Sequence, residues 1–388
     1  MPEFHPSSKP ERIEVIDALR GLALLGILLA NVPYSSEATA VDAATKAGFH
    51  LLIDKKFITI FSMLFGFGSF IQFQRATENG IAFRPYFFRR MLLLFLIGCV
   101  HAYLFWFGDI LRDYAICGMA LLLVYRWPAK KQLIAGATIT VIATGTIYIL
   151  NGILEPQYSY DRSLILVHPT TLSYLQYLEI NMTIDPFVNF IQDKPITLAF
   201  CFGNMLLGFS LARLGFFQYT KQFRKVRRKL ILFGATVGLL CSYLYWLVTT
   251  GKLELTPALA WLPLVIVAGM VLQSLFYISL FIELSERSAW TKLLLLFAPI
   301  GRMALTNYLL QTVFYLLVFF HWTNGLKLFG HISISQSYLL AVAFFILQAI
   351  LSNFWLRYHR QGPVEKLWKK MAYSFQKNRV QAGVGTSA

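Results

Sequence analysis

Charged residues are scarce in this chain, and their scarcity excludes a water-soluble globule. Only 14% of the 388 residues are charged, whereas 57% are hydrophobic and 16% are aromatic. So little polar surface cannot coat a soluble protein of this size. The apolar residues also form blocks of roughly 18 to 25, the length that crosses a bilayer core of about 30 Å. The composition therefore indicates an integral membrane protein.

Cysteines and the common catalytic motifs are also scarce. The four cysteines each stand alone in an apolar block, without CxxC spacing, so neither a disulfide framework nor a metal site is expected. The sequence contains no Walker loop, Rossmann fingerprint, GxSxG elbow or HExxH motif. It therefore gives no support to ATPase, nicotinamide-dependent or zinc-protease activity.

Ten apolar blocks, separated by charged or turn-rich breaks, predict an all-α polytopic membrane bundle of about ten transmembrane helices. The ninth block contains Pro299 and Gly301, so we expect a break in that helix. The approximate spans are 18–33, 56–73, 89–107, 109–125, 132–153, 195–214, 229–250, 259–282, 293–320 and 334–356.

The basic residues predict that both termini lie in the cytoplasm. Ten spans place both ends on one side, and 25 of the 35 Lys and Arg residues then fall on that side, against 7 on the other. Topology thus explains the net charge of +16, and no nucleic-acid partner is expected. We expect one polytopic domain over 1–374, with an external loop at about 152–194 and a disordered cytoplasmic tail at 375–388.

The first of three polar clusters inside the predicted spans contains Asp17, Arg20 and Asn31. A charged side chain within a bilayer costs about 2.5 kcal/mol or more, so each needs a partner or a function. Asp17 and Arg20 are three residues apart, which predicts an ion pair on one helix face. The pair is either a topological anchor or a site where Arg20 binds a phosphate or carboxylate from the cytoplasm.

The second cluster contains His101, Asp109, Arg112 and Asp113, on either side of a predicted tight turn. Asp109 and Asp113 have helical i,i+4 spacing, and Arg112 is within reach of Asp109. We expect His101 to face Asp113 across an antiparallel helix pair. A carboxylate behind an imidazole raises its basicity, as a general base requires. The alternative is a histidine that only hydrogen-bonds a neighbouring helix.

The third cluster, in the ninth span, contains Arg302, Thr306, Asn307 and Gln311. Their spacing places them on one or two adjacent stripes that face the bundle interior. Thr306, Asn307 and Gln311 have an equally simple interpretation as polar contacts between helices. That interpretation is weaker for Arg302, which carries a full charge.

Five sequence stretches, in the order in which they occur along the chain, resemble the YeiB-like bacterial inner-membrane proteins, a family of unknown function. The resemblance runs from about Ile13 to Trp368 and implies a multi-pass protein of the bacterial inner membrane, in contact with membrane lipids. The stretches are IDALRGLALLGILLAN, KFITIFSMLFGFG, RRMLLLFLIGCVHAYLFWFGDIL, GRMALTNYLLQT and FWLRYHRQGPVEKLW.

The first helix is also similar to that of the transmembrane acyltransferases, which move an acyl group from a cytoplasmic thioester donor to an acceptor. In the O-acetyltransferases of this group, an Arg on helix one is followed eleven residues later by His. Here Arg20 is followed at that spacing by Asn31, and an amide cannot act as a general base. The base must then come from elsewhere, and His101 is the candidate. The resemblance implies acyl-CoA as the donor and a sugar or a lipid as the acceptor.

Our leading hypothesis is therefore a membrane-embedded acyltransferase. In it the donor's phosphates bind Arg20 and Arg302, His101 is the base, and Asn31 donates a hydrogen bond to the thioester carbonyl. The other candidate site residues are two that orient His101, Asp109 and Asp113, and four that bind ligand, Asp17, Arg112, Asn307 and Gln311.

Two other classes of function stay open. One is a transporter or flippase for a small organic solute or a lipid, and the other is a non-catalytic membrane scaffold. A homo-oligomer is also compatible with the sequence. Arg20 and Arg302 are expected near the inner face and His101 toward the outer face, so they form one site only if a deep tunnel joins them.

Overall fold

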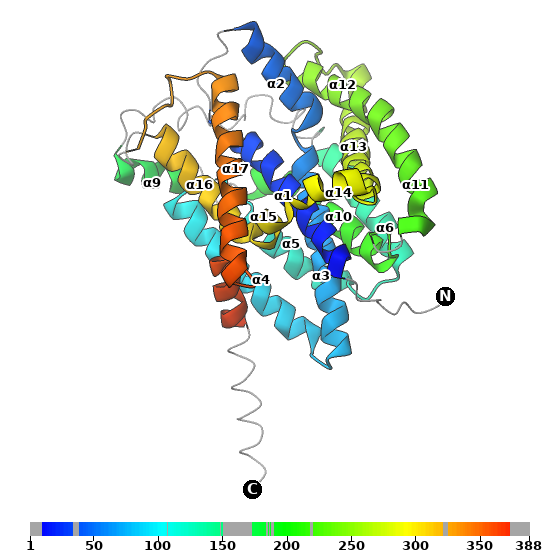
Figure 1. Ribbon diagram of the computed structural model, residues 1–388. Coiled ribbons are helices and arrows are strands. Elements are labelled where there is room, and N and C mark those ends of the chain that lie inside the picture. Colours follow the sequence, from blue (N-terminus) through cyan, green and yellow to red (C-terminus); the bar gives the residue numbers. More distant parts are fainter. Residues whose placement is uncertain are drawn as a thin grey trace.

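The computed structural model describes residues 10–33, 39–106, 108–147, 149, 173–183, 185, 187, 190–217, 220–320 and 325–372. Within these residues the chain forms a bundle of helices and contains no β-strand, as Figure 1 shows, so the prediction of an all-α fold is confirmed. The predicted tail at 375–388 and much of the predicted loop at 152–194 lie outside the described residues.

The helices of the N-terminal half hold the first two polar clusters. They are α1 (Pro10–Asn31), α2 (Ala40–Leu52), α3 (Lys56–Glu78), α4 (Phe83–Leu104), α5 (Leu111–Val124), α6 (Ala129–Thr138), the π-helical η1 (Ile139–Ala143), α9 (Tyr174–Thr183) and α10 (Phe190–Arg213).

The helices of the C-terminal half pack around this group. They are α11 (Thr220–Phe233), the π-helical η2 (Gly234–Gly238), α12 (Leu239–Thr249), η3 (Pro257–Leu259), α13 (Leu262–Ser285), α14 (Ser288–Leu295), α15 (Ala298–Arg302), α16 (Ala304–Phe319) and α17 (Ile334–Tyr358). A further helical segment, residues 363–372, follows and is called the C-terminal segment below.

Each of the ten predicted spans falls on one or more of these helices, but fewer are long and apolar enough to cross a membrane. Among the described residues there are six: Ala40–Glu78, Phe83–Leu104, Lys194–Arg213, Gln222–Thr249, Pro257–Ser285 and Ile334–Tyr358. The other predicted spans lie on α1, which is rich in charge, on the 14-residue α5, on α6 with η1, and on α16. The count of ten spans and the cytoplasmic termini therefore stay predictions.

The break predicted in the ninth span is present. Helix α14 ends at Leu295 and α15 starts at Ala298 with proline in its first turn; α15 in turn ends at Arg302, and α16 starts at Ala304. The backbone amides of Leu305 and Thr306 at this new start donate to the Glu365 carboxylate, at 2.7 and 3.0 Å. A side chain of the C-terminal segment thus satisfies the donors that the break leaves unpaired.

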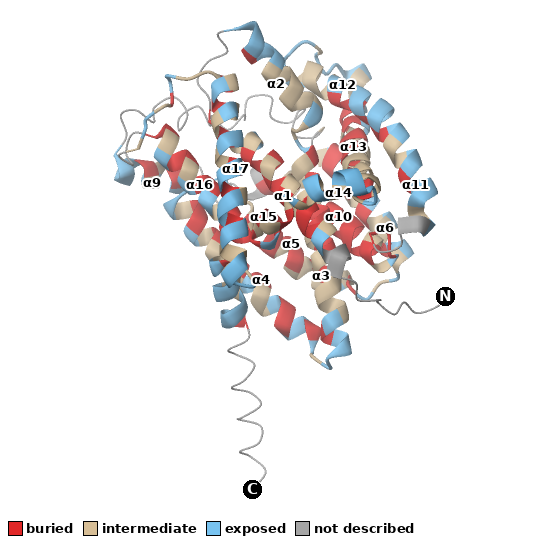
Figure 2. Ribbon diagram, in the orientation of Figure 1, coloured by how far each residue is buried: buried red, intermediate tan, exposed pale blue. Residues whose placement is uncertain are grey.

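Close helix contacts hold the bundle core together. Helices α1 and α15 touch at Gly21 and Gly301, where a Cβ atom on Gly301 would lie 1.8 Å from the carbonyl oxygen of Asp17. Such contacts between small residues are typical of membrane helices. In Figure 2 the buried residues gather at the centre, whereas the outer faces of α11 and α17 are exposed. Exposed Leu232 on α11 and Ile350 on α17 are apolar, which suits contact with lipid.

Candidate active site

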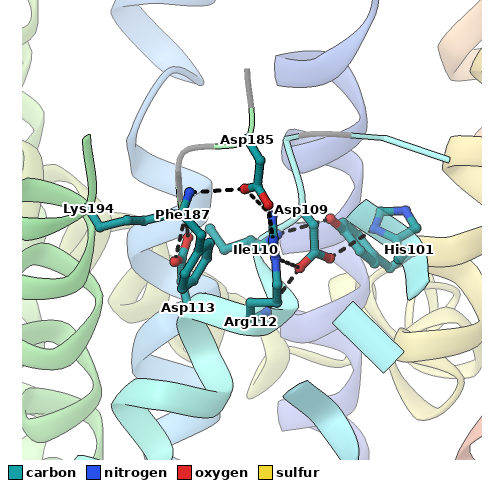
Figure 3. A network of polar contacts seen from close by, with 9 residues as sticks. His101, Asp109, Ile110, Arg112, Asp113, Asp185, Phe187 and Lys194 are labelled. Carbon is teal, nitrogen blue, oxygen red and sulfur yellow. Dashed lines mark hydrogen bonds and ion pairs between the residues drawn. The ribbon is translucent and has the colours of Figure 1, made fainter. Parts of the chain in front are cut away.

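A buried histidine and aspartate form the centre of the site. His101 lies in the last turn of α4, and Asp109 lies in the turn that leads into α5. His101 Nδ1 is 2.9 Å from Asp109 Oδ1 (Figure 3), and both side chains are almost completely buried. Because a carboxylate can only accept, Nδ1 carries the proton and Nε2 carries the lone pair. The pair has the chemistry of an oriented general base.

Asp109, not Asp113, is the carboxylate that contacts His101, which corrects the expectation from helical spacing. The spacing rule fails because α5 begins only at Leu111, so Asp109 lies before the helix and does not share a helical face with Asp113. Among the described residues, the ion-pair partner of Asp113 is Lys194 of α10, whose Nζ lies 2.8 and 3.0 Å from the two carboxylate oxygens.

Arg112 connects the centre of the site to the chain that precedes α10. Its Nη1 and Nη2 atoms donate to the two oxygens of Asp185 at 2.7 and 2.9 Å, and its Nε lies 3.6 Å from Asp109 Oδ2. The ring of Phe187 packs against both Arg112 and Lys194, with each cation 4.4 Å from the ring centre. Burial raises the pKa of Asp185, but the bonds from Arg112 outweigh it and hold the pKa below its usual range.

The charges of this cluster do not sum to zero when all its carboxylates and cations are ionised. Three carboxylates face two cations, so with all five ionised the cluster carries one uncompensated negative charge. His101 contacts this cluster through Asp109. The cluster therefore stabilises the imidazolium that a general base forms when it accepts a proton.

The second nitrogen of His101 contacts a hydroxyl from a distant helix. His101 Nε2 is 2.8 Å from the Oγ1 atom of Thr312 on α16, and Thr312 is 4% exposed. On the other side, the His101 ring packs against the ring of Tyr308, with 5.3 Å between centroids. Helix α16 thus brings one hydroxyl group and one aromatic ring to the imidazole.

A basic vestibule of about 530 Å³ lies where α1, α3, α4 and α15 meet the C-terminal segment. Asp17 is the carboxylate in its wall, and it pairs with Arg20 at 2.9 Å, which confirms the ion pair predicted from sequence. The structure also brings Arg20 and Arg302 together here, as the acyltransferase hypothesis expected. The basic residues in the wall are Arg20, Arg75, Arg90, Arg302, Arg360 and Lys369.

A second cavity, of about 250 Å³, leads inward from the vestibule. Arg20, Arg90 and Arg302 line both, and the buried Tyr114 and Tyr308 also line the second cavity. Tyr308 is the residue that packs against His101, so one side chain separates this cavity from the buried base. The two groups that the sequence placed at opposite depths are thus linked through a cavity and one tyrosine.

His101 also lines a lateral groove of about 400 Å³. The groove runs between α4, α16 and the C-terminal segment, and His101 and Thr312 lie among otherwise apolar lining residues. Leu96 and Val100 of α4 and Val313 of α16 line it and are exposed. Trp368 lines both this groove and the inner cavity. Because α4 is one of the six candidate membrane spans, the groove would face lipid hydrocarbon.

Three predicted site residues make hydrogen bonds away from the His101–Asp109 pair. The amide of Asn31 donates to the carbonyl of Ile27 in its own helix at 3.0 Å. Asn307 donates to Ser352 of α17 at 2.9 Å, and Gln311 donates to Leu24 of α1 at 3.4 Å. Asn307 and Gln311 therefore have the simpler role of contacts between helices.

Sequence patterns gave little signal for the remaining groups of the site. Asp185 and Lys194 carry charge, but they belong to the stretch predicted to form an external loop, at about 152–194. Arg90 was interpreted as one of the basic residues that set membrane topology, next to a predicted span. Thr312 directly follows Gln311 of the third cluster, and only its contact with His101, 211 residues earlier, distinguishes it from an ordinary helix threonine.

Comparison with known proteins divides the chain into two matched regions. Residues 12–164 match the family described as heparan-alpha-glucosaminide N-acetyltransferase, catalytic. Residues 211–375 match the family described as protein of unknown function (DUF418). The first region contains Arg20, His101 and Asp109, and the second contains Arg302 and Thr312, so the site is built from both. Neither match supports the transporter alternative.

Three bacterial relatives align along almost the whole chain. YxaH of Bacillus subtilis (strain 168) is 29% identical over 409 residues, which cover 96% of this chain and 97% of the relative. The 39.9 kDa protein encoded in the amylase 3' region of Bacillus acidopullulyticus is 30% identical over 377 residues, covering 95% and 96%. YeiB of Escherichia coli (strain K12) is 32% identical over 395 residues, covering 93% and 96%. No solved structure matches the chain. The extent of these alignments shows that the chain belongs to the YeiB-like family.

Proposed function

We propose that this protein is a membrane-embedded acyltransferase that takes an acyl group from acyl-CoA and passes it to an acceptor at or across the bacterial inner membrane. The observation that carries the proposal is the cavity that starts at Arg20 and Arg302 and ends against Tyr308, directly behind the His101–Asp109 pair. The match of residues 12–164 to an N-acetyltransferase catalytic family supports the same class of reaction.

The basic vestibule would hold the phosphates of the donor. Six cationic side chains surround one carboxylate, and guanidinium groups bind phosphate with charge-assisted, often bidentate hydrogen bonds. Arg302 is exposed, so it can reach a ligand that enters from solvent. The residues of the vestibule come largely from segments that the sequence assigns to the cytoplasm, which is where the acyl-CoA pool lies. The vestibule would therefore open to the cytoplasm.

The inner cavity and the groove would bring the two substrates to His101. The donor's thioester arm extends along the inner cavity to Tyr308 and reaches His101 when the Tyr308 side chain moves aside. The acceptor reaches His101 through the lateral groove, whose apolar lining favours a hydroxyl carried on a hydrocarbon chain. His101 removes the proton from the attacking hydroxyl, and Asp109 stabilises the resulting imidazolium.

Binding of radiolabelled acetyl-CoA to the purified protein in lipid nanodiscs tests the vestibule. Arg302→Ala should weaken binding by about 10- to 150-fold, since one lost charge-assisted bond is worth roughly 1.5 to 3 kcal/mol. Lys130→Ala is the matched control, because Lys130 is an exposed cation on α6 and lies away from the vestibule wall. A small acetyl thioester without phosphates should bind both variants equally.

Product analysis in the same nanodiscs tests the transfer. Label is expected in the extracted lipid fraction, and label only in a water-soluble sugar would contradict the role of the groove. If wild-type protein neither binds acetyl-CoA nor releases its thiol, the acyltransferase proposal is wrong. Solute uptake into vesicles without covalent change would then favour a transporter.

A further inference from the structure

Thr312, His101 and Asp109 form a continuous line of hydrogen bonds inside the membrane bundle. The distances are 2.8 Å from Thr312 Oγ1 to His101 Nε2 and 2.9 Å from His101 Nδ1 to Asp109 Oδ1. All three side chains are at least 96% buried. Because Nδ1 donates to the carboxylate, Nε2 must accept, so the Thr312 hydroxyl donates its hydrogen directly to the base.

A hydroxyl, a base and a carboxylate that orients the base make up the arrangement that activates a nucleophile in covalent catalysis. We propose that Thr312 is a catalytic nucleophile that carries the acyl group as an ester between donor and acceptor. The inference rests on the acyl transfer proposed above and adds a covalent intermediate to it. Thr312, on α16, would then be the second reacting group beside His101. It lies on the opposite side of the imidazole from Asp109.

In the first half-reaction, Thr312 Oγ1 forms a bond to the carbonyl carbon of the thioester while its proton moves to His101 Nε2. The tetrahedral intermediate then breaks its carbon–sulfur bond, and the leaving thiolate takes the proton from His101. The products are an acyl ester on Thr312 and a free thiol. No oxidant, metal or further reactant is needed for this step.

In the second half-reaction, the acceptor hydroxyl gives its proton to His101 Nε2 as its oxygen bonds to the acyl carbon. The bond from that carbon to Thr312 Oγ1 breaks, and Thr312 takes the proton back from His101. The enzyme returns to its starting state, and the acceptor has become an ester. His101 thus acts once as base and once as acid in each half-reaction.

The surroundings of Thr312 suit an acyl carrier. Thr312 and His101 line the lateral groove, which gives an acyl chain on Thr312 an apolar space outside the helix core. The backbone amide of Arg112 donates to Asp109 Oδ2, and this bond fixes the carboxylate beside the imidazole. The net negative charge of the cluster stabilises the imidazolium that forms in each half-reaction.

A trapping experiment tests the intermediate. Purified protein is freed of acceptor lipid, mixed with radiolabelled acetyl-CoA, quenched in acid and digested for mass spectrometry. We expect a burst of free thiol close to one per protein and an acetyl group on the peptide that contains Thr312. Thr312→Ser should keep the label, because a primary hydroxyl also attacks. Thr312→Val should lose the label and reduce the burst rate by about 100-fold or more.

The outcomes separate this inference from the proposed function. Thiol release and product formation that persist in Thr312→Val, with no labelled peptide in wild type, would show direct transfer and overturn the covalent role. Absence of donor binding and thiol release in wild type would overturn acyl transfer itself. Acetyl-CoA binding and the melting temperature of Thr312→Val must match wild type, which distinguishes a lost nucleophile from a lost fold.

Discussion

Asp185 and Asp109 bind the same guanidinium, that of Arg112. Asp185 takes both terminal nitrogens, at 2.7 and 2.9 Å, while Asp109 accepts the Arg112 backbone amide at 3.0 Å and lies 3.6 Å from Nε. Asp185, which lies outside the candidate membrane spans, therefore helps to position Asp109 by holding Arg112. The stability of the site and the orientation of its base are coupled through one arginine.

Asp185→Ala should strongly destabilise the protein, because it leaves the buried charge of Arg112 without its main partner. Loss of one member of a buried ion pair costs about 3 to 5 kcal/mol. Denaturant unfolding in mixed micelles measures the change, with exposed Glu254→Ala as the matched carboxylate control. Equal stability of the two variants would mean that the Arg112 pair contributes little.

The contribution of Asp185 should also depend on pH. Its pKa in the folded protein is lowered, so its contribution is complete above the unfolded value of about 3.9 and is lost as pH falls through the folded pKa. The stability difference between wild type and Asp185→Ala should therefore be constant above about pH 5 and shrink under stronger acid. A difference that grows on acidification would contradict the lowered pKa.

Asp109→Asn should stop catalysis while leaving the donor bound. Asp109 Oδ2 accepts the Arg112 backbone amide, so the amide oxygen of an asparagine would take that position and its NH₂ group would face His101. His101 Nδ1 would then have to accept, and Nε2 would carry the proton and lose its ability to act as a base. We expect kcat to fall by about 10²- to 10⁴-fold with unchanged acetyl-CoA affinity.

Asp113→Asn is the control for that prediction. Asp113 pairs with Lys194 and does not contact His101, so its replacement should leave the tautomer of His101 unchanged. We expect this variant to have a lower free energy of unfolding and a nearly unchanged kcat. Steady-state rates together with nitrogen NMR of the histidine ring distinguish the two variants. A normal rate for Asp109→Asn, with the loss in Asp113→Asn instead, would favour the pairing expected from helical spacing.

Gly301→Ala should disturb the vestibule. The added Cβ would lie 1.8 Å from the carbonyl oxygen of Asp17, so α1 and α15 must separate, at a cost of roughly 1 to 3 kcal/mol. The Asp17–Arg20 pair lies at this contact, so we also expect weaker acetyl-CoA binding. Gly48→Ala is the control, because its Cβ meets no atom within 4 Å, and it should be neutral or slightly stabilising. Similar melting temperatures for the two variants would contradict the close packing.

The sequence by itself determined the features that depend on local chemistry. Apolar blocks of membrane-spanning length specify helices, since backbone groups must pair within the chain in lipid. The break near Pro299 follows from the missing amide of proline, and the Asp17–Arg20 pair follows from i,i+3 geometry on one helix. Each of these rests on residues a few positions apart, so no knowledge of the fold was needed.

Only the tertiary structure decided which polar groups meet. Asp109 rather than Asp113 contacts His101 because α5 begins after Asp109, a boundary that the i,i+4 pattern does not reveal. Thr312 and Asp185 reach the site from residues far along the chain, and helix packing, not sequence spacing, sets such distances. A buried polar side chain must find some partner in the folded bundle, and the choice among equally capable partners is made by how the helices cross.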